Sequence, residues 1–221
     1  MPQKMLYSTA TDYHLLRPGN LIADIYNKVS DKCQPFMLFP DEILVQPGMH
    51  EEPIAWFFTH GMFSTYRRID KLQVFTSFAT PESMSVFGLA EGLMKESFFI
   101  LKAETPCEGF SFNLKSLYEK NDPKLWQNIS ELLSWFIKLA VIRDHQLVGV
   151  SSYSIIRSQL ITLMSYSEEF RLRVTALAFI KQRTNLSRSN ILRVFNELQV
   201  GEYISMHRGH LLGFRYLPLH F

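Results

Sequence analysis

Residues 178–216 read AFIKQRTNLSRSNILRVFNELQVGEYISMHRGHLLGFRY, and this segment is the most informative about the fold. A first helix is predicted to end at Gln182–Thr184. A tight turn follows, in which Asn185 is predicted to adopt a left-handed backbone, as Asn does more readily than most residues. Ser187 is a typical N-cap, so a second helix is predicted to run from Arg188 to about Gln199. The pattern therefore indicates two helices joined by a short turn.

The predicted second helix has an apolar face and a polar face. The apolar side chains, which should face the core, are Ile191, Val194, Phe195 and Leu198. At about 100° per residue, the opposite face carries Ser189, Arg193 and Asn196, and Arg188 extends from the first turn. Arginine can make paired hydrogen bonds to guanine and asparagine to adenine, so this face suits the major groove of DNA. The N-terminal end of the helix should enter the groove first.

A β-hairpin is predicted after the second helix. Gly201 should end the helix, and two short strands should flank a turn at Arg208–Gly209. At the tip of this wing, His207 and Arg208 are expected to meet phosphates or a minor groove, as is the hydroxyl group of Ser187 at the start of the second helix. Helix, turn, helix and wing together predict a winged helix-turn-helix. A small helical domain that binds protein instead of nucleic acid is the alternative.

Charge is divided unevenly along the chain. Residues 171–221 contain eight Lys and Arg against two Glu, a net charge of +6, whereas the remaining residues have a net charge of −4. The basic C-terminal part favours a polyanionic partner, although a charge cluster is also typical of an ordinary solvated surface.

A long helix is predicted to begin at Pro123, with Asp122 as its N-cap. Two apolar stripes run along it, one made of Leu125, Ile129, Leu132, Phe136 and Leu139 and the other of Trp126, Leu133, Ile137 and Ala140. Two stripes need two packing partners. We therefore predict that one stripe packs on the same chain and that the first stripe forms a homodimer interface. Burial of the helix inside one domain is the alternative.

Two further helices are predicted at 153–164 and 168–180, after a hinge that contains Gly149 and Ser151–Ser152. Together with residues 178–216, they form a basic C-terminal module.

The N-terminal part shows a different periodicity. A short helix near residues 21–29 is followed, over residues 36–114, by short aromatic and β-branched runs between turn residues. These runs are FMLF, EILVQ, IAWFFTH, MFSTY, LQVFTSF, MSVFGL and SFFILKA. About seven short strands without intervening helices predict an antiparallel β-roll. We therefore predict an α+β protein with a β-roll at 1–120, a long connecting and dimerisation helix at 121–149, and a winged helix-turn-helix at 150–221.

Composition and motifs argue against several classes of protein. The sequence has no run of eighteen apolar residues and no signal-peptide pattern, which predicts a cytoplasmic location. Two cysteines are too few for a four-thiolate iron–sulfur cluster or a structural zinc site. The histidines form no His-x-His pair, and neither HExxH, nor a phosphate-binding glycine loop, nor a G-x-S-x-G elbow occurs. We therefore expect no enzymatic activity, no metal and no cofactor.

Several segments resemble a known family. They are FGLAEGLMKE (87–96), IRDHQLVGVSSYSIIRSQLITLM (142–164), YSEEFRLRV (166–174), QRTNLSRSNILRVFNELQVGEYI (182–204) and GHLLGFRYLP (209–218). They resemble the IprA family of inhibitors of hydrogen peroxide resistance, which in turn is similar to the CRP/FNR regulators. The resemblance covers most of the chain. It implies a dimeric, sequence-specific DNA-binding transcription regulator linked to oxidative stress, with a cyclic-nucleotide-binding-like roll and with double-stranded DNA and RNA polymerase as partners.

The resemblance also implies roles for single residues. Ser187 would touch phosphate, and Arg188, Ser189 and Arg193 would occupy base-reading positions. Many CRP/FNR regulators have glutamate where this chain has Ser189, so their operator sequence is not carried over. A cyclic-nucleotide pocket needs an arginine that clamps the phosphate, but Ser97 stands at that position. We therefore predict that cAMP and cGMP do not bind. The effector, the target genes and the sign of regulation stay open.

The family name raises a redox interpretation in which Cys33 or Cys107 senses peroxide. Neither cysteine has an electropositive sequence neighbourhood, since Cys33 follows Asp31 and Lys32 and Cys107 precedes Glu108. A buried structural thiol is the favoured interpretation for Cys107.

Overall fold

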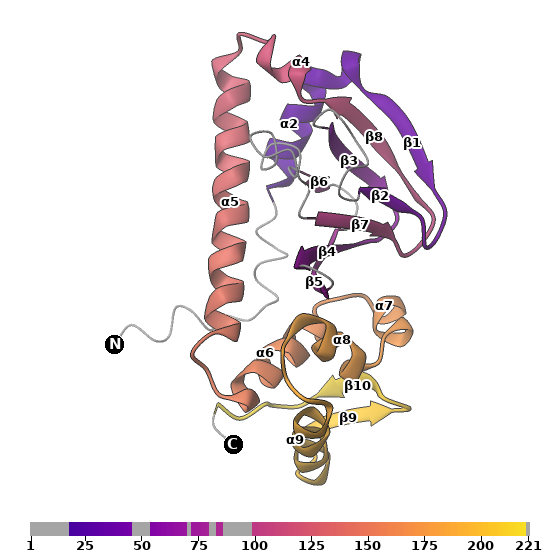
Figure 1. The fold of residues 1–221 in the computed structure, drawn as a ribbon, viewed down its shortest axis with the longest axis vertical. Helices are drawn as coiled ribbons and strands as arrows, with labels where there is room; N and C mark the ends of the chain where they lie inside the picture. The colour runs from indigo at the N-terminus through magenta and orange to yellow at the C-terminus, as the bar shows by residue number, and fades with distance from the viewer. Residues whose placement is uncertain (1–17, 46–53, 70–71, 80–82, 86–98, 220–221) are drawn as a thin grey trace. The chain divides into compact units, whose positions relative to one another are not determined.

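The computed structural model describes residues 18–45, 54–69, 72–79, 83–85 and 99–219 (Figure 1). They belong to two compact units, one formed by residues 18–138 and one that contains residues 139–219. The boundary falls inside the long helix α5 (Pro123–Leu147), whereas the sequence analysis treated this helix as a segment of its own. None of the helices in the described part of the chain has the length and apolar character needed to cross a bilayer.

The N-terminal unit is built on two four-stranded antiparallel sheets. Its strands are β1 (Gln34–Leu38), β2 (Ile43–Val45), β3 (Ile54–His60), β4 (Phe63–Ile69), β5 (Leu72–Ala79), β6 (Ser83–Ser85), β7 (Phe99–Ala103) and β8 (Cys107–Asn113). The strand orders are β1-β8-β3-β6 and β2-β7-β4-β5. Two antiparallel sheets of short strands confirm the predicted roll.

Strand β8 was not among the runs that the sequence analysis picked out, yet it lies between β1 and β3 in the first sheet. A glycine at its centre explains both facts. A Cβ atom at Gly109 would lie 2.0 Å from the carbonyl oxygen of Phe57, so this close approach of two strands requires glycine. The same glycine weakens the strand pattern in the sequence.

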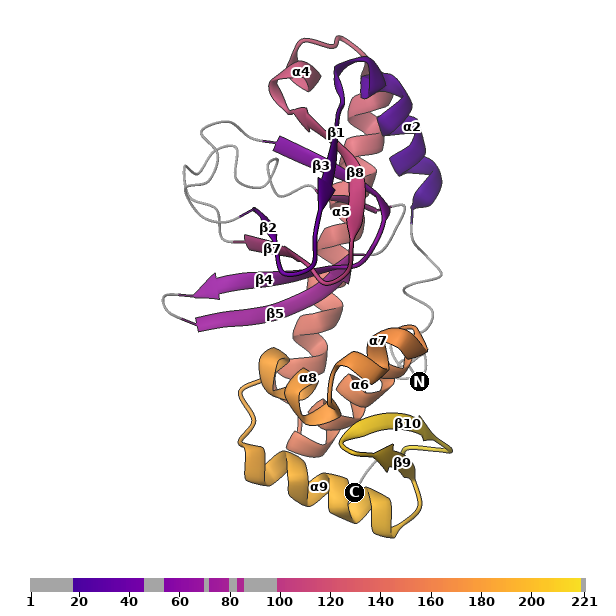
Figure 2. The same ribbon diagram turned by 90° about the vertical axis from the view of Figure 1, so that its right-hand side faces the viewer.

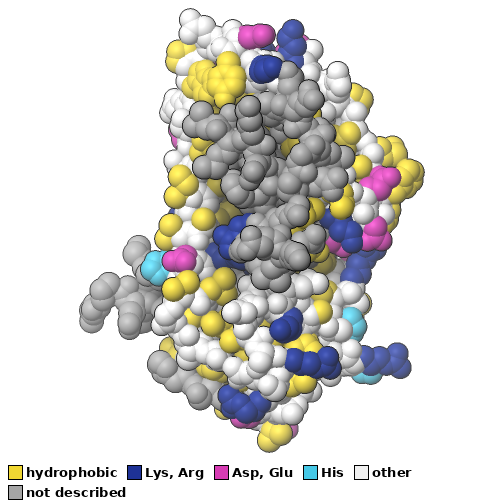
Figure 3. Space-filling model, viewed as in Figure 1, with side chains coloured by type: hydrophobic (Ala, Val, Ile, Leu, Met, Phe, Trp, Pro, Cys, Tyr) yellow, Lys and Arg dark blue, Asp and Glu magenta, His cyan; other side chains and the backbone are white. Residues whose placement is uncertain are grey.

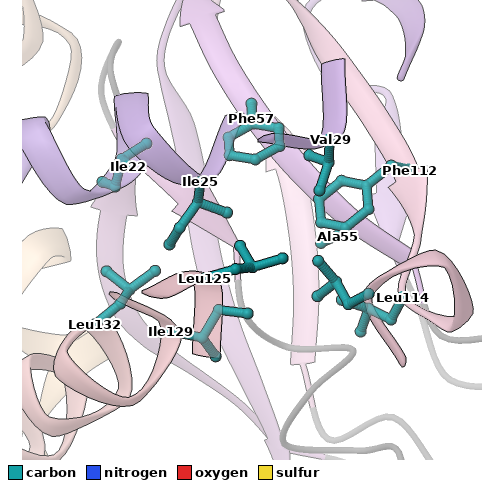
Figure 4. Close-up of a cluster of buried hydrophobic side chains, with 11 residues drawn as sticks. Ile22, Ile25, Val29, Ala55, Phe57, Phe112, Leu114, Leu125, Ile129 and Leu132 are labelled. Carbon is teal, nitrogen blue, oxygen red and sulfur yellow. The ribbon is translucent and has the colours of Figure 1, made fainter. Parts of the chain in front are cut away.

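Strand β3 contributes side chains to two separate hydrophobic clusters, because successive side chains of a strand point to opposite faces. Trp56 and Phe58 belong to one cluster, and Phe57 to the other. The cluster around Phe57 also contains Ile22, Ile25 and Val29 of helix α2 (Gly19–Val29), Ala55, Phe112, Leu114, Leu117, and Leu125, Ile129 and Leu132 of α5 (Figure 4). The predicted N-terminal helix is thus confirmed, and it packs inside the roll unit.

Helix α5 begins where the sequence placed it. The Asp122 carboxylate accepts hydrogen bonds from the backbone amides of Lys124 and Leu125, at 2.9 and 3.0 Å, and Pro123 is the first helical residue. Lys28 donates to the same carboxylate and holds the pKa of Asp122 below its usual value. The cap therefore also connects α5 to α2. The described part of this unit also contains two short helices, η1 (Ser30–Lys32) and α4 (Lys115–Tyr118).

The stripe of α5 predicted to form the dimer interface lies largely inside the roll. Leu125, Ile129 and Leu132 are at most 2% exposed in the cluster of Figure 4, and Phe136 packs against that cluster. The assignment of these residues to a dimer interface is therefore wrong, because the chain's own core already covers them. Helical spacing alone reveals two stripes but does not say which of them faces the sheet. Leu139, the last member, is half-buried.

The C-terminal unit consists of four helices and a hairpin after the end of α5. Its elements are α6 (Ser152–Met164), α7 (Glu168–Arg173), α8 (Ala176–Arg183), α9 (Arg188–Val200), β9 (Ile204–His207) and β10 (His210–Phe214), shown from a second side in Figure 2. The hydroxyl groups of Ser151, Ser167, Thr175 and Ser187 cap the N-termini of α6 to α9 in turn. Each helix start is therefore encoded by the residue immediately before it.

One predicted helix is divided in two. The sequence analysis expected a helix over 168–180, but Val174 and Thr175 are extended and separate α7 from α8. Thr175 then caps the new helix through the amide of Ala178. The amide of Ala176 donates to the carbonyl oxygen of Gly209 at 2.9 Å, so the break is stabilised by a residue that is distant in the sequence.

Candidate nucleic-acid interface

Helix α9 separates its apolar and polar side chains as predicted. Ser187 Oγ accepts a hydrogen bond from the amide of Asn190 at 3.2 Å, which confirms the N-cap. The apolar face, formed by Ile191, Val194, Phe195 and Leu198, is at most 3% exposed. The side chains proposed for DNA contact on α9 and on the hairpin are all exposed, namely Ser187, Arg188, Ser189, Arg193, Asn196, His207 and Arg208.

The turn between α8 and α9 differs from its prediction. Asn185 keeps a negative φ and is not left-handed. Instead, Thr184 is extended, and its hydroxyl group donates to the carbonyl oxygen of Ile180 at 2.8 Å and accepts from the amide of Leu186 at 3.4 Å. Lys181 Nζ donates to the carbonyl oxygen of Leu186 at 3.3 Å. Side-chain hydrogen bonds therefore close this turn without a left-handed residue.

The two arginines of α9 differ in their surroundings. Arg193 makes an ion pair with Glu197 at 2.8 Å and a hydrogen bond to Asn190 Oδ1 at 3.3 Å, although its side chain remains 63% exposed. Arg188 forms no ion pair with any residue that the structure describes. Of the two, Arg188 is thus the arginine whose charge no described residue neutralises.

A groove of about 640 Å³ lies between α8, α9 and the wing. Its apolar lining comes from Leu177, Leu192, Phe195 and Met206, and its cations are Lys181, Arg188 and Arg208. Among the described residues, no Asp or Glu lines this groove. On the face shown in Figure 3, Lys and Arg side chains gather over the C-terminal unit, and acidic side chains are sparse there. The groove is therefore suited to an anionic ligand with some apolar surface.

The hairpin has the expected two-residue turn. His207 pairs with His210 across it, and the residues between them, Arg208 and Gly209, have positive φ values of 49° and 84°. Two positive φ angles define a type I′ turn, whose twist matches that of the strands. The turn therefore presents Arg208 at the tip of the wing.

A set of hydrogen bonds that the sequence did not reveal connects the wing to the break between α7 and α8. Besides the bond from Ala176 to Gly209, His210 Nδ1 lies 3.1 Å from the carbonyl oxygen of Val174 and 3.2 Å from that of Arg171. The guanidinium of Arg171 donates to the carbonyl oxygen of Leu212 at 3.3 Å. Since both acceptors at Nδ1 are carbonyl groups, this nitrogen must carry the proton. We call these contacts the wing clamp.

One of the eight C-terminal cations is not on the surface. Arg183 is 8% exposed, its Nε donates to Gln159 Oε1 at 2.7 Å, and its guanidinium lies 5.0 Å from the centre of the Phe179 ring. Burial lowers the pKa of Arg183. This arginine joins α8 to α6 and is unavailable to an outside anion, so the net charge of the segment overstates the charge of its surface.

Both thiols are shielded in the roll unit. Burial raises the pKa of Cys33 to about 11, and Cys33 Sγ lies 3.4 Å from the carbonyl oxygen of Val29. Cys107 is fully buried, which also raises its pKa, and its thiol donates to the carbonyl oxygen of Thr105 at 3.0 Å. Neither thiol therefore has the thiolate character that makes a cysteine react readily with peroxide.

The segment predicted to hold the degenerate nucleotide site, residues 87–98 with Ser97, lies outside the described residues. Lys102, which follows it on β7, makes an ion pair with Asp41, and this hydrogen bond raises the pKa of Lys102. The charge of Lys102 is therefore already neutralised within the roll.

Comparison with known proteins supports this description of the C-terminal unit. Residues 152–219 match the family model described as winged helix-turn-helix DNA binding. Among solved structures, the c-di-GMP-responsive global regulator CLP of Xanthomonas campestris superposes with a TM-score of 0.70 over 88% of this chain and 100% of that chain, at 14% identity. A regulator of the CRP/FNR family from Eubacterium rectale gives a TM-score of 0.66 over 87% of this chain and 90% of that chain, at 15% identity. The chain thus has the fold of the CRP/FNR regulators.

Curated relatives confirm the resemblance seen in the sequence. The chain is 36% identical, over 137 residues, to the inhibitor of hydrogen peroxide resistance of Escherichia coli (strain K12), and equally to that of Salmonella typhimurium. The matched region covers 60% of this chain and spans 65% of the length of these relatives.

Proposed function

We propose that this protein is a sequence-specific, double-stranded-DNA-binding transcription regulator, that it acts as a homodimer, and that it has no enzymatic activity. The observation that carries the proposal is the groove beside α9, where Arg188 and Arg208 are exposed and no acidic side chain appears among the described lining residues. A polyanion with readable edges is the ligand that such a surface fits.

The geometry supports a division of roles. Arg188, Ser189 and Asn196 lie on the outer part of α9 and would read base edges. Ser187, at the helix N-terminus, would contact phosphate together with His207 and Arg208 of the wing, all three of which are exposed. Arg193 would read bases only after its ion pair with Glu197 is broken, so its contact with DNA has a free-energy cost that the contact of Arg188 does not have.

We assign the dimer interface to exposed apolar residues of α5 instead of to the buried stripe. Ile137 is 65% exposed and Val141 is 50% exposed, and they lie one turn apart on one face of the helix. In a symmetric pair, each would meet its counterpart in the second copy. Two recognition helices would then lie about 34 Å apart and select a near-palindromic site.

The names of the relatives support a role in the response to hydrogen peroxide, which we propose without direct sensing by Cys33 or Cys107 and without cAMP as effector. Contact with RNA polymerase at the regulated promoter belongs to the same proposal.

The decisive experiment measures binding of the full-length protein to duplexes enriched from a randomised pool, over a range of salt concentrations. Affinity should fall with salt with a logarithmic slope of roughly −0.9 for each phosphate neutralised. Arg188→Ala should weaken binding by roughly five- to a hundredfold and relax sequence preference at one position. Arg208→Ala should weaken binding to all sequences alike and make the slope shallower by about 0.9.

The matched control is Arg173→Ala, which removes the same charge from α7, outside the groove. It should change binding little. Binding that does not depend on salt, or equal effects of Arg173→Ala and Arg188→Ala, would favour a protein-binding winged helix and overturn the proposal.

A further inference from the structure

Leu192 is an exposed apolar residue on α9. It is 37% exposed, whereas its neighbours Ile191 and Val194 are at most 1% exposed. The side chain of Leu192 therefore lies outside the core of the unit. A single exposed leucine is ordinary on a protein surface, so exposure alone assigns it no role.

Its position gives the second observation. Arg188, Leu192 and Asn196 follow one another at intervals of four residues, so they share one face of the helix, and all three line the groove. Leu192 thus lies between the side chain expected to pair with guanine and the side chain expected to pair with adenine.

The major groove offers one apolar group along its base edges, the 5-methyl group of thymine, among hydrogen-bond donors and acceptors. An apolar side chain between two hydrogen-bonding readers matches that group. A polar base edge facing Leu192 would lose its hydration without gaining a partner, so leucine also disfavours the alternatives.

We propose that Leu192 recognises the methyl group of one thymine in each half-site, next to the bases read by Arg188 and Asn196. The proposal rests on the proposed function, since it names a base contact within the same interface. It assigns to the recognition helix a specificity-determining residue that sequence analysis assigned to neither its core nor its polar face.

Replacement of thymine by deoxyuridine tests the proposal, because it removes the methyl group and leaves the hydrogen-bonding edge unchanged. The probe is a duplex enriched from a randomised pool by the full-length protein, with each thymine replaced singly by deoxyuridine. For the unaltered protein, one replacement per half-site should lower affinity about fourfold, the effect of burying one methyl group. Leu192→Ala should bind the thymine and deoxyuridine duplexes equally at that position.

Val200→Ala is the matched control. Val200 is 86% exposed and also lies on α9, but it is the last residue of the helix and does not line the groove. This variant should keep the full preference for thymine. Thermal unfolding of Leu192→Ala should show that the exposed site tolerates the change.

Indifference of the unaltered protein to every deoxyuridine replacement, or retention of the preference by Leu192→Ala, would overturn the proposal while leaving sequence-specific binding intact. Failure to enrich any sequence would instead overturn the proposed function, and this inference with it.

Discussion

The two units use their charged side chains differently. In the roll unit, Lys28, Lys102 and Lys120 each pair with an aspartate of the same unit. In the winged-helix unit, Arg188 and Arg208 form no ion pair with a described residue and line one groove. Unpaired surface cations add little to the stability of their own fold, whereas they attract an external anion over a distance of about 10 Å. The contrast indicates that these three lysines are neutralised within the roll, whereas Arg188 and Arg208 of the winged helix are available to a partner.

The largest effect is expected for the face of α5 that packs in the core of the roll unit. Leu132→Ala removes a fully buried side chain and should lower the free energy of unfolding of the roll unit by about 2–5 kcal/mol. Ile137→Ala, five residues along the same helix, should leave that free energy nearly unchanged and should weaken the proposed dimer. Denaturant unfolding and sedimentation measure the two quantities. The contrast between the two faces of α5 would be lost if Ile137→Ala destabilised the fold as much as Leu132→Ala.

A smaller effect should come from the wing clamp, which holds the unpaired cation Arg208 beside α9. His210→Ala removes the donor to two carbonyl groups and should cost about 1–3 kcal/mol of stability, because it leaves partly buried acceptors unpaired. DNA affinity should fall for all sequences alike, and hydroxyl-radical footprints should lose protection where the wing lies. His210→Asn, whose amide can donate at a similar position, should restore part of both. Selective loss at one base position would argue instead that His210 reads DNA.

The smallest effect concerns the thiols of the roll. Alkylation requires the thiolate, and the pKa of Cys33 is raised to about 11, so its rate should keep rising with pH well above the usual range for cysteine. At neutral pH the reaction should be far slower than that of a free cysteine. A mass-spectrometric time course with iodoacetamide from neutral to alkaline pH checks this. A half-maximal rate near neutral pH would show that Cys33 is poised to react, and would reopen direct sensing by the roll.

The sequence predicted the features that are encoded locally. The N-caps at Asp122 and Ser187, the position of the turn at Arg208–Gly209, and the buried face of α9 all depend on residues within a few positions of one another. These features were sufficient to place the exposed DNA-contact candidates on one helix and one hairpin.

Prediction from the sequence failed where a feature depends on a residue that is distant in the chain. The break at Val174 is stabilised by His210, and the buried Arg183 donates a hydrogen bond to Gln159, which lies 24 residues before it. The stripe of α5 that contains Leu132 was assigned to a dimer because periodicity does not identify what covers it. Leu192 was overlooked because it is an apolar residue on the exposed face that also carries Arg188 and Asn196.

The wing clamp also limits how such proteins could exchange their DNA-reading parts. Hydrogen bonds between the wing and residues 174–176 fix the start of α8. A recognition helix that is transplanted into another scaffold without residues 171–176 and the hairpin would therefore lose contacts that set its orientation. Any recombinant that borrows this specificity would have to inherit residues 171–214 as one block.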